Sequence, residues 1–297
     1  MIGEYKVVIV TPAGRQRYLE LLIPQVQNYK QGGADEYRLW VNTTDQNDID
    51  YMTQKAAEDP DFIKLEHLTV PHNGSNSIYS FFKNCVDEKT VYVRLDDDIV
   101  LLDTPEQFKA FVEFRINHPE YFLVYGNILN NAILSHIHQK SGKLSTKDGN
   151  VGYSCMDDIG WKNGEFTLKL HEYVLGKTLS YFYFKDIWNL VDFERVSINC
   201  ISWLGSEFKR FEGNVGTDEE QWLSSDKPRE LNKTNCIYGQ FVCVHYAFYT
   251  QRDVVDASNI LELYKERIGQ PFYHAVLVLV IVLVFVSMHT ISTSDFL

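Results

Sequence analysis

The sequence predicts an α/β fold, in which one large domain is built on a mostly parallel sheet flanked by helices. Strand-like apolar runs alternate with helix-like runs over the first third of the chain, which is the pattern of strands connected by crossover helices. The chain has 297 residues, of which 45% are hydrophobic and 23% are charged. This composition is typical of a globular protein and excludes a disordered, collagen-like or coiled-coil chain.

The first half of the chain supplies four strands and three helices. Runs of β-branched and aromatic residues predict strands at 5–10, 38–42, 62–68 and 91–95. Apolar residues at helical spacing predict helices over 19–26, 48–58 and 76–86. We place the turn after the first strand at Thr11-Pro12-Ala13-Gly14, and we expect Pro24 to kink or delay the first helix.

The alternation is less regular beyond Pro105. A helix is expected near 106–117, and strands at 122–128, 197–203 and 241–246. Leu, Tyr and Phe at helical spacing predict a helix over 173–184. The polar stretch 141–152 is expected to be a surface loop.

The C-terminal segment 271–297 is unusually apolar. Residues 275–286 are twelve consecutive apolar residues, and Asp295 is the only formal charge after residue 273. With its neighbours this stretch approaches the roughly 17–25 apolar residues of a membrane-spanning helix. A membrane anchor, a buried core segment and a tail without function are the three interpretations. No secretory signal is recognisable at the N-terminus, so we expect a cytoplasmic protein that contacts the cytoplasmic face of a membrane through 275–286.

Charge and cysteine content narrow the classes of function. The chain carries 40 acidic and 28 basic residues, and its net charge of −12 argues against a nucleic-acid partner. The five cysteines are odd in number, lack C-x-x-C spacing and mostly lie in apolar runs. We therefore expect reduced, buried thiols without a catalytic role.

The triplet Asp96-Asp97-Asp98 directly follows the strand predicted at 91–95. Adjacent carboxylates raise one another's pKa unless a cation neutralises them. In an open α/β sheet, ligands bind at the carboxyl ends of the strands. Carboxylate oxygens suit Mg²⁺ or Mn²⁺, which commonly bridge a protein to substrate phosphates. The triplet therefore indicates a divalent metal site, and the alternative is a solvated acidic turn.

Two later segments carry further candidates. Thr217-Asp218-Glu219-Glu220 reads as a capping box, with Thr217 as the cap and Glu220 reaching back. The alternative is that a carboxylate at this helix start is a general base for an acceptor hydroxyl. His245 ends a predicted strand and is either a core histidine or an additional metal ligand.

In combination, these motifs resemble the nucleotide-sugar-dependent glycosyltransferases of the GT-A fold, in particular family 2-like enzymes. Four elements carry the resemblance in order along the chain: VVIVTPAGR with RLWVNTTD, YVRLDDDIV, GTDEEQW and CVHY. YVRLDDDIV is similar to that family's D-x-D motif, GTDEEQW to its x-E-D catalytic element, and CVHY to its late metal-binding histidine. The resemblance implies a Rossmann-like sheet in a single large domain.

The resemblance also implies roles for individual residues. Asp218 would be the base of an inverting reaction, but Thr217 stands where a glutamate is usual, so Glu219 is the alternative base. The metal ligands would be Asp96, Asp98 and His245. Donor-binding residues would be Thr11, Arg15, Asp45, Asn76, Asp96 and Asp97.

The implied activity is metal-dependent transfer of a hexosyl or pentosyl group. A nucleoside diphosphate sugar would be the donor, a glycan or other hydroxyl compound the acceptor, and Mn²⁺ or Mg²⁺ the cofactor. Residues 1–103 would form the donor half and 104–270 the acceptor and catalytic half of the same domain. The alternatives are a sugar-phosphate nucleotidyltransferase and a catalytically silent glycan-binding protein on the same fold.

Overall fold

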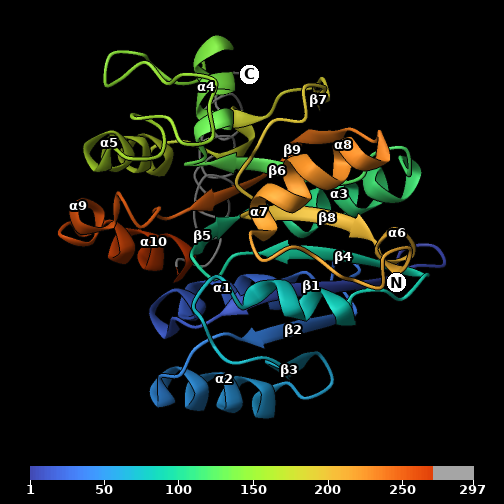
Figure 1. Cartoon of the computed structure of the whole chain (residues 1–297). Helices are drawn as coiled ribbons and strands as arrows, with labels where there is room; N and C mark the ends of the chain where they lie inside the picture. The colour runs from blue at the N-terminus through green and yellow to red at the C-terminus, as the bar shows by residue number, and fades with distance from the viewer. Residues whose placement is uncertain (270–297) are drawn as a thin grey trace, which may run out of the picture.

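A nine-stranded sheet runs through the molecule and helices pack against it (Figure 1). The computed structural model describes residues 1–269. The strand order is β3-β2-β1-β4-β8-β6-β9-β5, and β7 also pairs with β9. The strands are β1 (Lys6–Ala13), β2 (Glu36–Val41), β3 (Ile63–His67), β4 (Thr90–Leu95), β5 (Ile99–Leu102), β6 (Val124–Leu129), β7 (Trp188–Leu190), β8 (Cys200–Leu204) and β9 (Asn235–His245).

Helices connect most of the strands, and several are short. They are α1 (Gln16–Asn28), α2 (Gln46–Glu58), η1 (Ile78–Asn84), α3 (Pro105–Asn117), α4 (Ala132–Lys140), α5 (Gly164–Leu175), η2 (Leu179–Phe182), α6 (Gly205–Lys209), α7 (Glu219–Gln221), η3 (Trp222–Asp226), α8 (Lys227–Leu231), α9 (Arg252–Asp256) and α10 (Ile260–Gly269). The predicted fold class, an α/β domain with a Rossmann-like sheet flanked by helices, is confirmed.

Strands β3, β2, β1 and β4 are parallel neighbours, as the alternation predicted. The expected turn at Thr11 is wrong, because β1 continues to Ala13. Its pairing with β4 ends at Val10, whereas its pairing with β2 continues to Ala13. Pro12, which has no N–H to donate, is therefore tolerated where β1 has a partner on one side only.

Three helix predictions need correction. Pro24 does not delay α1, which begins at Gln16 and continues through Pro24 to Asn28. The segment predicted as a helix over 76–86 forms the shorter 3₁₀ helix η1. The helix expected over 173–184 lies earlier, because α5 ends at Leu175 and Gly176 is its C-cap. Glycine directly after a helix is a common stop signal, and the apolar residues beyond it belong to η2.

Antiparallel pairing begins where β8 joins β4. Strand β6 then pairs antiparallel with β8 and parallel with β9, and β5 and β7 pair antiparallel with β9. The β4–β8 pair brings the acidic triplet close to residues that lie about a hundred positions later in the chain. The backbone N–H of Asp96 donates to the carbonyl of Asn199 at 2.9 Å.

Two apolar clusters form the core. The larger one surrounds the parallel strands, and the smaller one lies between α5, α10 and the end of β9. All five cysteines are free and buried, as expected. Burial raises the pKa of the Cys85, Cys236 and Cys243 thiols. Within residues 1–269, none of the helices has the length and hydropathy to cross a membrane. The predicted tail, 271–297, lies outside the described residues.

Candidate active site

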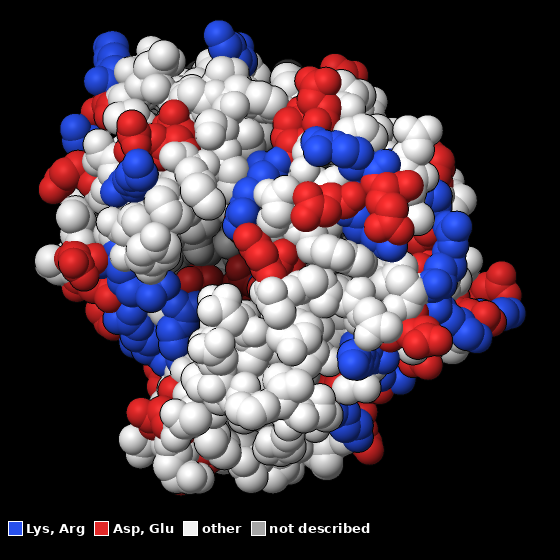
Figure 2. All heavy atoms as spheres, in the orientation of Figure 1, with Lys and Arg blue, Asp and Glu red and all other residues white. Residues whose placement is uncertain are grey.

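A cleft of about 500 Å³ opens at the carboxyl ends of β1 and β4. In Figure 2, acidic and basic side chains gather around this hollow. Its walls come from the ends of β1, β4 and β9, the segments that follow β2 and precede β8, and α7. The residues that line it are Pro12, Gly14, Arg15, Asn42, Gly74, Ser75, Ile78, Arg94, Asp96, Asp97, Asp98, Ile198, Asn199, Glu219, Glu220, His245, Ala247, Phe248, Tyr249 and Arg252.

Arginine neutralises the two buried members of the triplet. Asp97 and Asp98 are each 4% exposed, and the Arg15 guanidinium forms ion pairs with both carboxylates. Burial raises the pKa of Asp97. Burial acts in the same direction on Asp98, but Arg15, His245 and Arg252 outweigh it and lower the pKa of this carboxyl. Asp98 is therefore a carboxylate throughout the physiological pH range.

Asp98 faces His245 across a short gap. The Asp98 Oδ1 and His245 Nε2 atoms lie 3.5 Å apart. The His245 Nδ1 atom lies 3.0 Å from the carbonyl oxygen of Asn130, so this nitrogen carries the proton and donates it. In a neutral imidazole, Nε2 then points a lone pair toward a carboxylate. This arrangement is stable only with a cation between the two groups or with a second proton on the ring.

Asp96 is turned toward a different set of partners. Its Oδ1 accepts from Arg94 at 2.9 Å, and its Oδ2 accepts from the Asn199 side-chain amide at 3.0 Å. Arg94 Nη1 lies 3.6 Å from Glu219 Oε1, beyond hydrogen-bond distance. This buried nitrogen has no hydrogen-bond partner within residues 1–269. Because an unpaired buried donor is costly, Arg94 is suited to a ligand oxygen.

The two candidate bases have opposite surroundings. Glu219 lines the cleft and is 8% exposed. Burial raises its pKa to about 7, although Arg94 opposes the increase. The Asp218 side chain is 56% exposed and does not line the cleft. It makes a two-pronged ion pair with Arg195 instead.

The predicted capping box is wrong in detail. Asp218, not Thr217, caps α7 by accepting from the Gln221 N–H at 3.1 Å. Glu220 does not reach back, because its carboxylate accepts from Arg195 at 2.9 Å. The cap and the candidate base are therefore two different residues of this acidic cluster. Asp218 is the structural cap, and Glu219 is the carboxylate inside the cleft.

Folding brings together most of the residues predicted from the sequence. Those that line the cleft are Arg15, Asp96, Asp97, Asp98, Glu219 and His245. Three predicted donor-binding residues do not line it. Thr11 is buried in β1, where its hydroxyl accepts a hydrogen bond from the Tyr37 hydroxyl. Asp45 caps α2 by accepting a hydrogen bond from the Asn47 N–H. Asn76 is exposed and lies next in the chain to the cleft residues Gly74 and Ser75.

Sequence reasoning missed several lining residues with chemistry of their own. Arg94, a charged residue inside an otherwise apolar strand, was a signal for the site because such a charge needs a buried partner. Arg252 follows the His245 strand closely and lies 3.5 Å from Asp98. Nothing in the local sequence around Asn199 indicated a site residue, because its contact with Asp96 depends on the pairing of β4 with β8.

The predicted metal ligands do not form a preassembled cage. No group of three or more His, Cys, Asp or Glu side chains in the described part of the chain is placed to hold a metal ion. Asp98 and His245 face each other, whereas both oxygens of Asp96 already accept hydrogen bonds. A metal at this site would therefore need ligands from outside the described residues.

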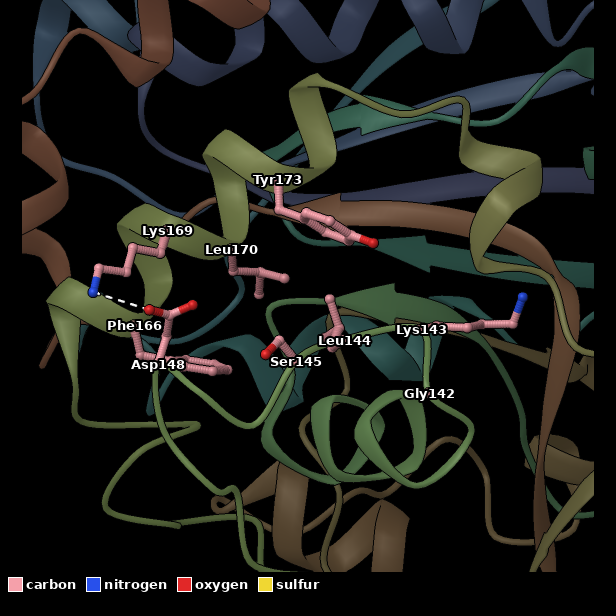
Figure 3. A pocket seen from close by; sticks show the side chains of 9 residues that line it. All are labelled: Gly142, Lys143, Leu144, Ser145, Asp148, Phe166, Lys169, Leu170 and Tyr173. Atoms are coloured by element: carbon pink, nitrogen blue, oxygen red, sulfur yellow. Dashed lines mark hydrogen bonds and ion pairs between the residues drawn. The ribbon is translucent and has the colours of Figure 1, made fainter.

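A separate cavity of about 220 Å³ lies between α5 and the loop that follows α4 (Figure 3). Leu144, Phe166 and Leu170 give it apolar walls, and Lys169 is paired with Asp148 at 3.0 Å. It shares no lining residue with the cleft. This cavity is therefore independent of the candidate active site.

Comparisons with known proteins support the fold. No protein-family model matches the chain, and no curated protein matches its sequence. GalNAc-T7, solved with UDP, GalNAc and Mn²⁺, is 8% identical with a TM-score of 0.50, over 83% of this chain and 44% of its own.

Two other solved structures match over most of their length. A mannosyltransferase, PcManGT from Pyrobaculum calidifontis, solved with GDP-Man and Mn²⁺, is 12% identical with a TM-score of 0.47, over 94% of this chain and 81% of its own. The 4-diphosphocytidyl-2C-methyl-D-erythritol synthase from Anaerococcus prevotii is 12% identical with a TM-score of 0.44, over 86% of this chain and 97% of its own. At such identities a likeness concerns the fold alone. The shared fold with GalNAc-T7 agrees with the GT-A type predicted from the sequence.

Proposed function

We propose that this chain is a glycosyltransferase that moves a sugar from a nucleoside diphosphate sugar to an acceptor hydroxyl. The observation that carries the proposal is that one cleft holds both the buried Asp triplet and the separate buried carboxylate of Glu219. An inverting transfer uses two such elements, one near the leaving diphosphate and one near the acceptor. GalNAc-T7, which shares the fold, was solved with a nucleoside diphosphate, a sugar and Mn²⁺.

Cationic side chains in the cleft suit a diphosphate. Arg15 and Arg252 line it and lie 2.9 and 3.5 Å from Asp98 Oδ2. Guanidinium groups bind phosphate oxygens through paired hydrogen bonds. The proposed donor would therefore be bound by Arg15 and Arg252.

The donor set fits a divalent metal of the Mn²⁺ or Mg²⁺ type. Asp98 and the Nε2 of His245 face each other, and the hydrogen bond from Nδ1 to Asn130 leaves Nε2 free to coordinate. Such ions often take one or two protein ligands and complete their coordination with substrate phosphates and water. Asp98 and His245 would hold the metal, and Asp96 would act through water or the donor. When bound, the metal would neutralise charge on the leaving diphosphate.

Glu219 is the proposed base. It accepts the proton of the acceptor hydroxyl as the acceptor oxygen forms a bond to the anomeric carbon. The bond from that carbon to the diphosphate breaks, and its electron pair leaves with the nucleoside diphosphate. A base on the side opposite the leaving group gives inversion, and Arg94 stabilises the Glu219 carboxylate before transfer.

A donor screen tests the proposed function. Purified protein with Mn²⁺ is incubated with nucleoside diphosphate sugars that contain hexoses or pentoses, and the release of nucleoside diphosphate is measured. We expect release from at least one donor and loss of release in chelator. Formation of pyrophosphate from a nucleoside triphosphate and a sugar phosphate would instead identify a nucleotidyltransferase. Donor or glycan binding without turnover would identify a catalytically silent protein.

Membrane contact through residues 275–286 stays a proposal, together with location at the cytoplasmic face of a membrane. It is supported by the twelve consecutive apolar residues, which follow the last described helix, α10. The division into a donor half, 1–103, and an acceptor half, 104–270, is likewise proposed. Lining residues from both halves meet in the cleft.

A further inference from the structure

Asn130 has an unusual backbone conformation directly after β6. Its φ of 61° lies in the left-handed region, which side chains other than glycine rarely adopt and asparagine tolerates best. Strands β6 and β9 are parallel neighbours, with Leu129 opposite Val244 (Figure 1). The next residues along the two strands are Asn130 and His245, so this conformation occurs directly beside the candidate metal site. Asn130 is fully buried there.

The side chain of Asn130 fastens the end of β6 to the segment that follows β9. Its Nδ2 donates to the carbonyl of Tyr246 at 3.0 Å and to Gln251 Oε1 at 3.1 Å. Its Oδ1 accepts from the Thr167 hydroxyl at 3.3 Å. A backbone carbonyl can only accept, so the Tyr246 contact fixes which end of the amide is the NH₂ group. Both ends of the Asn130 amide are therefore held.

The backbone carbonyl of Asn130 fixes the tautomer of His245. It accepts from His245 Nδ1 at 3.0 Å, which keeps the ring proton on that nitrogen. Without this acceptor, the proton would be better placed on Nε2, from which it could be donated to Asp98 Oδ1, 3.5 Å away. The Nε2 lone pair would then be lost to a metal. The acceptor at Nδ1 therefore determines whether the gap between His245 and Asp98 can hold a cation.

We propose that Asn130 is a positioning residue for the metal site, because its side-chain amide holds its backbone carbonyl on His245 Nδ1 and so keeps Nε2 available for a divalent metal; the inference rests on the proposed function. Asn130 does not line the cleft and acts only through His245. Partners that orient a metal ligand in this way typically change metal affinity about 10- to 100-fold.

The test measures binding of Mn²⁺ with UDP or GDP to the full chain. Calorimetry gives the affinity, and electron spin-echo spectroscopy of the bound Mn²⁺ detects a directly coordinated imidazole nitrogen. We expect Asn130→Ala and Asn130→Gly each to weaken Mn²⁺ binding about tenfold or more and to diminish the nitrogen signal. Asn130→Gly is the decisive variant. Glycine adopts a positive φ without strain, so its loss of affinity reports the missing amide rather than a strained backbone.

Asn232→Ala is the matched control. Asn232 is also left-handed, with a φ of 50°, but it caps the end of α8 and does not line the cleft. Its replacement should lower the melting temperature, because alanine is strained at a positive φ, and should leave the affinity for Mn²⁺ and the nitrogen signal as in wild type. This comparison separates an effect on the metal site from a general loss of stability.

The inference is overturned if Asn130→Gly binds Mn²⁺ as wild type does with an unchanged nitrogen signal, or if Asn232→Ala weakens binding as much. It is also overturned if wild type binds Mn²⁺ without a nitrogen signal, because His245 is then not a ligand. In these cases wild type still binds metal and nucleotide, so the proposed function stands. If wild type binds no Mn²⁺ with either nucleotide, the metal-dependent function fails, and the inference fails with it.

Discussion

Glu219 and Asp218 are neighbours in the chain, but the fold places their side chains in different environments. Glu219 is held inside the cleft near Arg94, whereas Asp218 caps α7 at the surface and pairs with Arg195. A general base must reach the acceptor proton, so the position of a carboxylate determines whether it can be the base before its pKa becomes relevant. At the scale of single residues, the candidate mechanism therefore depends on Glu219.

Replacing Glu219 should separate catalysis from donor binding. We expect Glu219→Gln to lower kcat by at least about 10²-fold, because it removes the base without changing side-chain size. Affinity for nucleoside diphosphate, measured by calorimetry with Mn²⁺, should stay within about twofold. Asp218→Asn is the comparison variant, since asparagine also caps helices well. A larger loss of kcat in Asp218→Asn than in Glu219→Gln would show that Asp218, not Glu219, is the base.

The pH dependence of turnover should show the raised pKa of Glu219. The base acts as a carboxylate, so kcat/KM should fall as the pH drops through about 7, the pKa to which burial raises this group. Stability should change in the opposite sense. A carboxyl whose folded pKa is raised stabilises the fold below its unfolded pKa and loses that contribution as pH rises through about 7.

Glu219→Gln removes this titration, so its melting temperature relative to wild type should rise between pH 5 and pH 8. Melting followed by circular dichroism at both pH values measures the difference. An acid limb of kcat/KM centred below pH 5, or a melting difference independent of pH, would contradict the assignment.

Asp98 should be required for metal-dependent donor binding. Asp98→Asn removes the charge that faces His245, and we expect binding of Mn²⁺ together with nucleoside diphosphate to weaken at least about tenfold. Paramagnetic broadening by Mn²⁺ or calorimetry measures this without turnover. Asp45→Asn is the control, because Asp45 caps α2 and does not line the cleft. Equal metal binding in Asp98→Asn and wild type would show that the metal is held elsewhere.

At the scale of elements, the β4–β8 pair holds the triplet in place. Strand β4 delivers Arg94 and the triplet, and the segment before β8 delivers Asn199 to Asp96. Gly205 directly follows β8, where the chain passes beside the backbone of Asp87, which precedes β4. A Cβ at Gly205 would overlap the Asp87 carbonyl. The close approach of the two backbones therefore requires glycine here.

Gly205→Ala should accordingly destabilise the domain. We expect the free energy of unfolding in urea to fall by about 1–3 kcal/mol, the usual cost of overpacking a close contact. Gly176→Ala is the matched control, since a Cβ there would lie 3.6 Å from the Tyr173 carbonyl oxygen, an ordinary contact. A loss at Gly176 as large as that at Gly205 would contradict the argument.

At the scale of the whole molecule, the end of α10 lies beside α5. Arg267 near the end of α10 donates to the carbonyls of Val174 and Lys177 at 3.0 and 2.8 Å. Close by, Lys177 Nζ lies 5.2 and 5.0 Å from the ring centroids of Tyr173 and Tyr181. These contacts hold the end of α10 against α5. The segment 275–286, for which we propose membrane contact, follows in the chain.

Truncation after Gly269 tests the role of the tail. We expect the shortened chain to fold, to bind nucleoside diphosphate as the full chain does, and to lose sedimentation with phospholipid vesicles. Both apolar clusters are built from residues of the described domain, which is the physical reason for expecting a stable product. If the shortened chain aggregates while the full chain stays in solution without lipid or detergent, the tail belongs to the core instead.

The positions of the first four strands along the chain and the position of the triplet could be predicted from sequence, because both are local. Hydrophobic period, turn residues and the end of a strand are visible in windows of a few residues, and the burial of the cysteines follows from their apolar surroundings. Most of the acidic and basic residues of the cleft were found for the same reason. They stand at strand ends that a parallel sheet gathers at one edge.

Only the tertiary structure decided which charged groups face one another. Asp96 meets Asn199 across 103 positions of sequence, and His245 meets Asp98 only because β9 ends beside the triplet. Burial likewise separates Glu219 from Asp218, although the two residues have the same local context. Side-chain burial and pKa depend on segments that converge from distant parts of the chain. Local sequence pattern therefore identified the candidate site residues, whereas long-range packing determined which of them lie in the cleft.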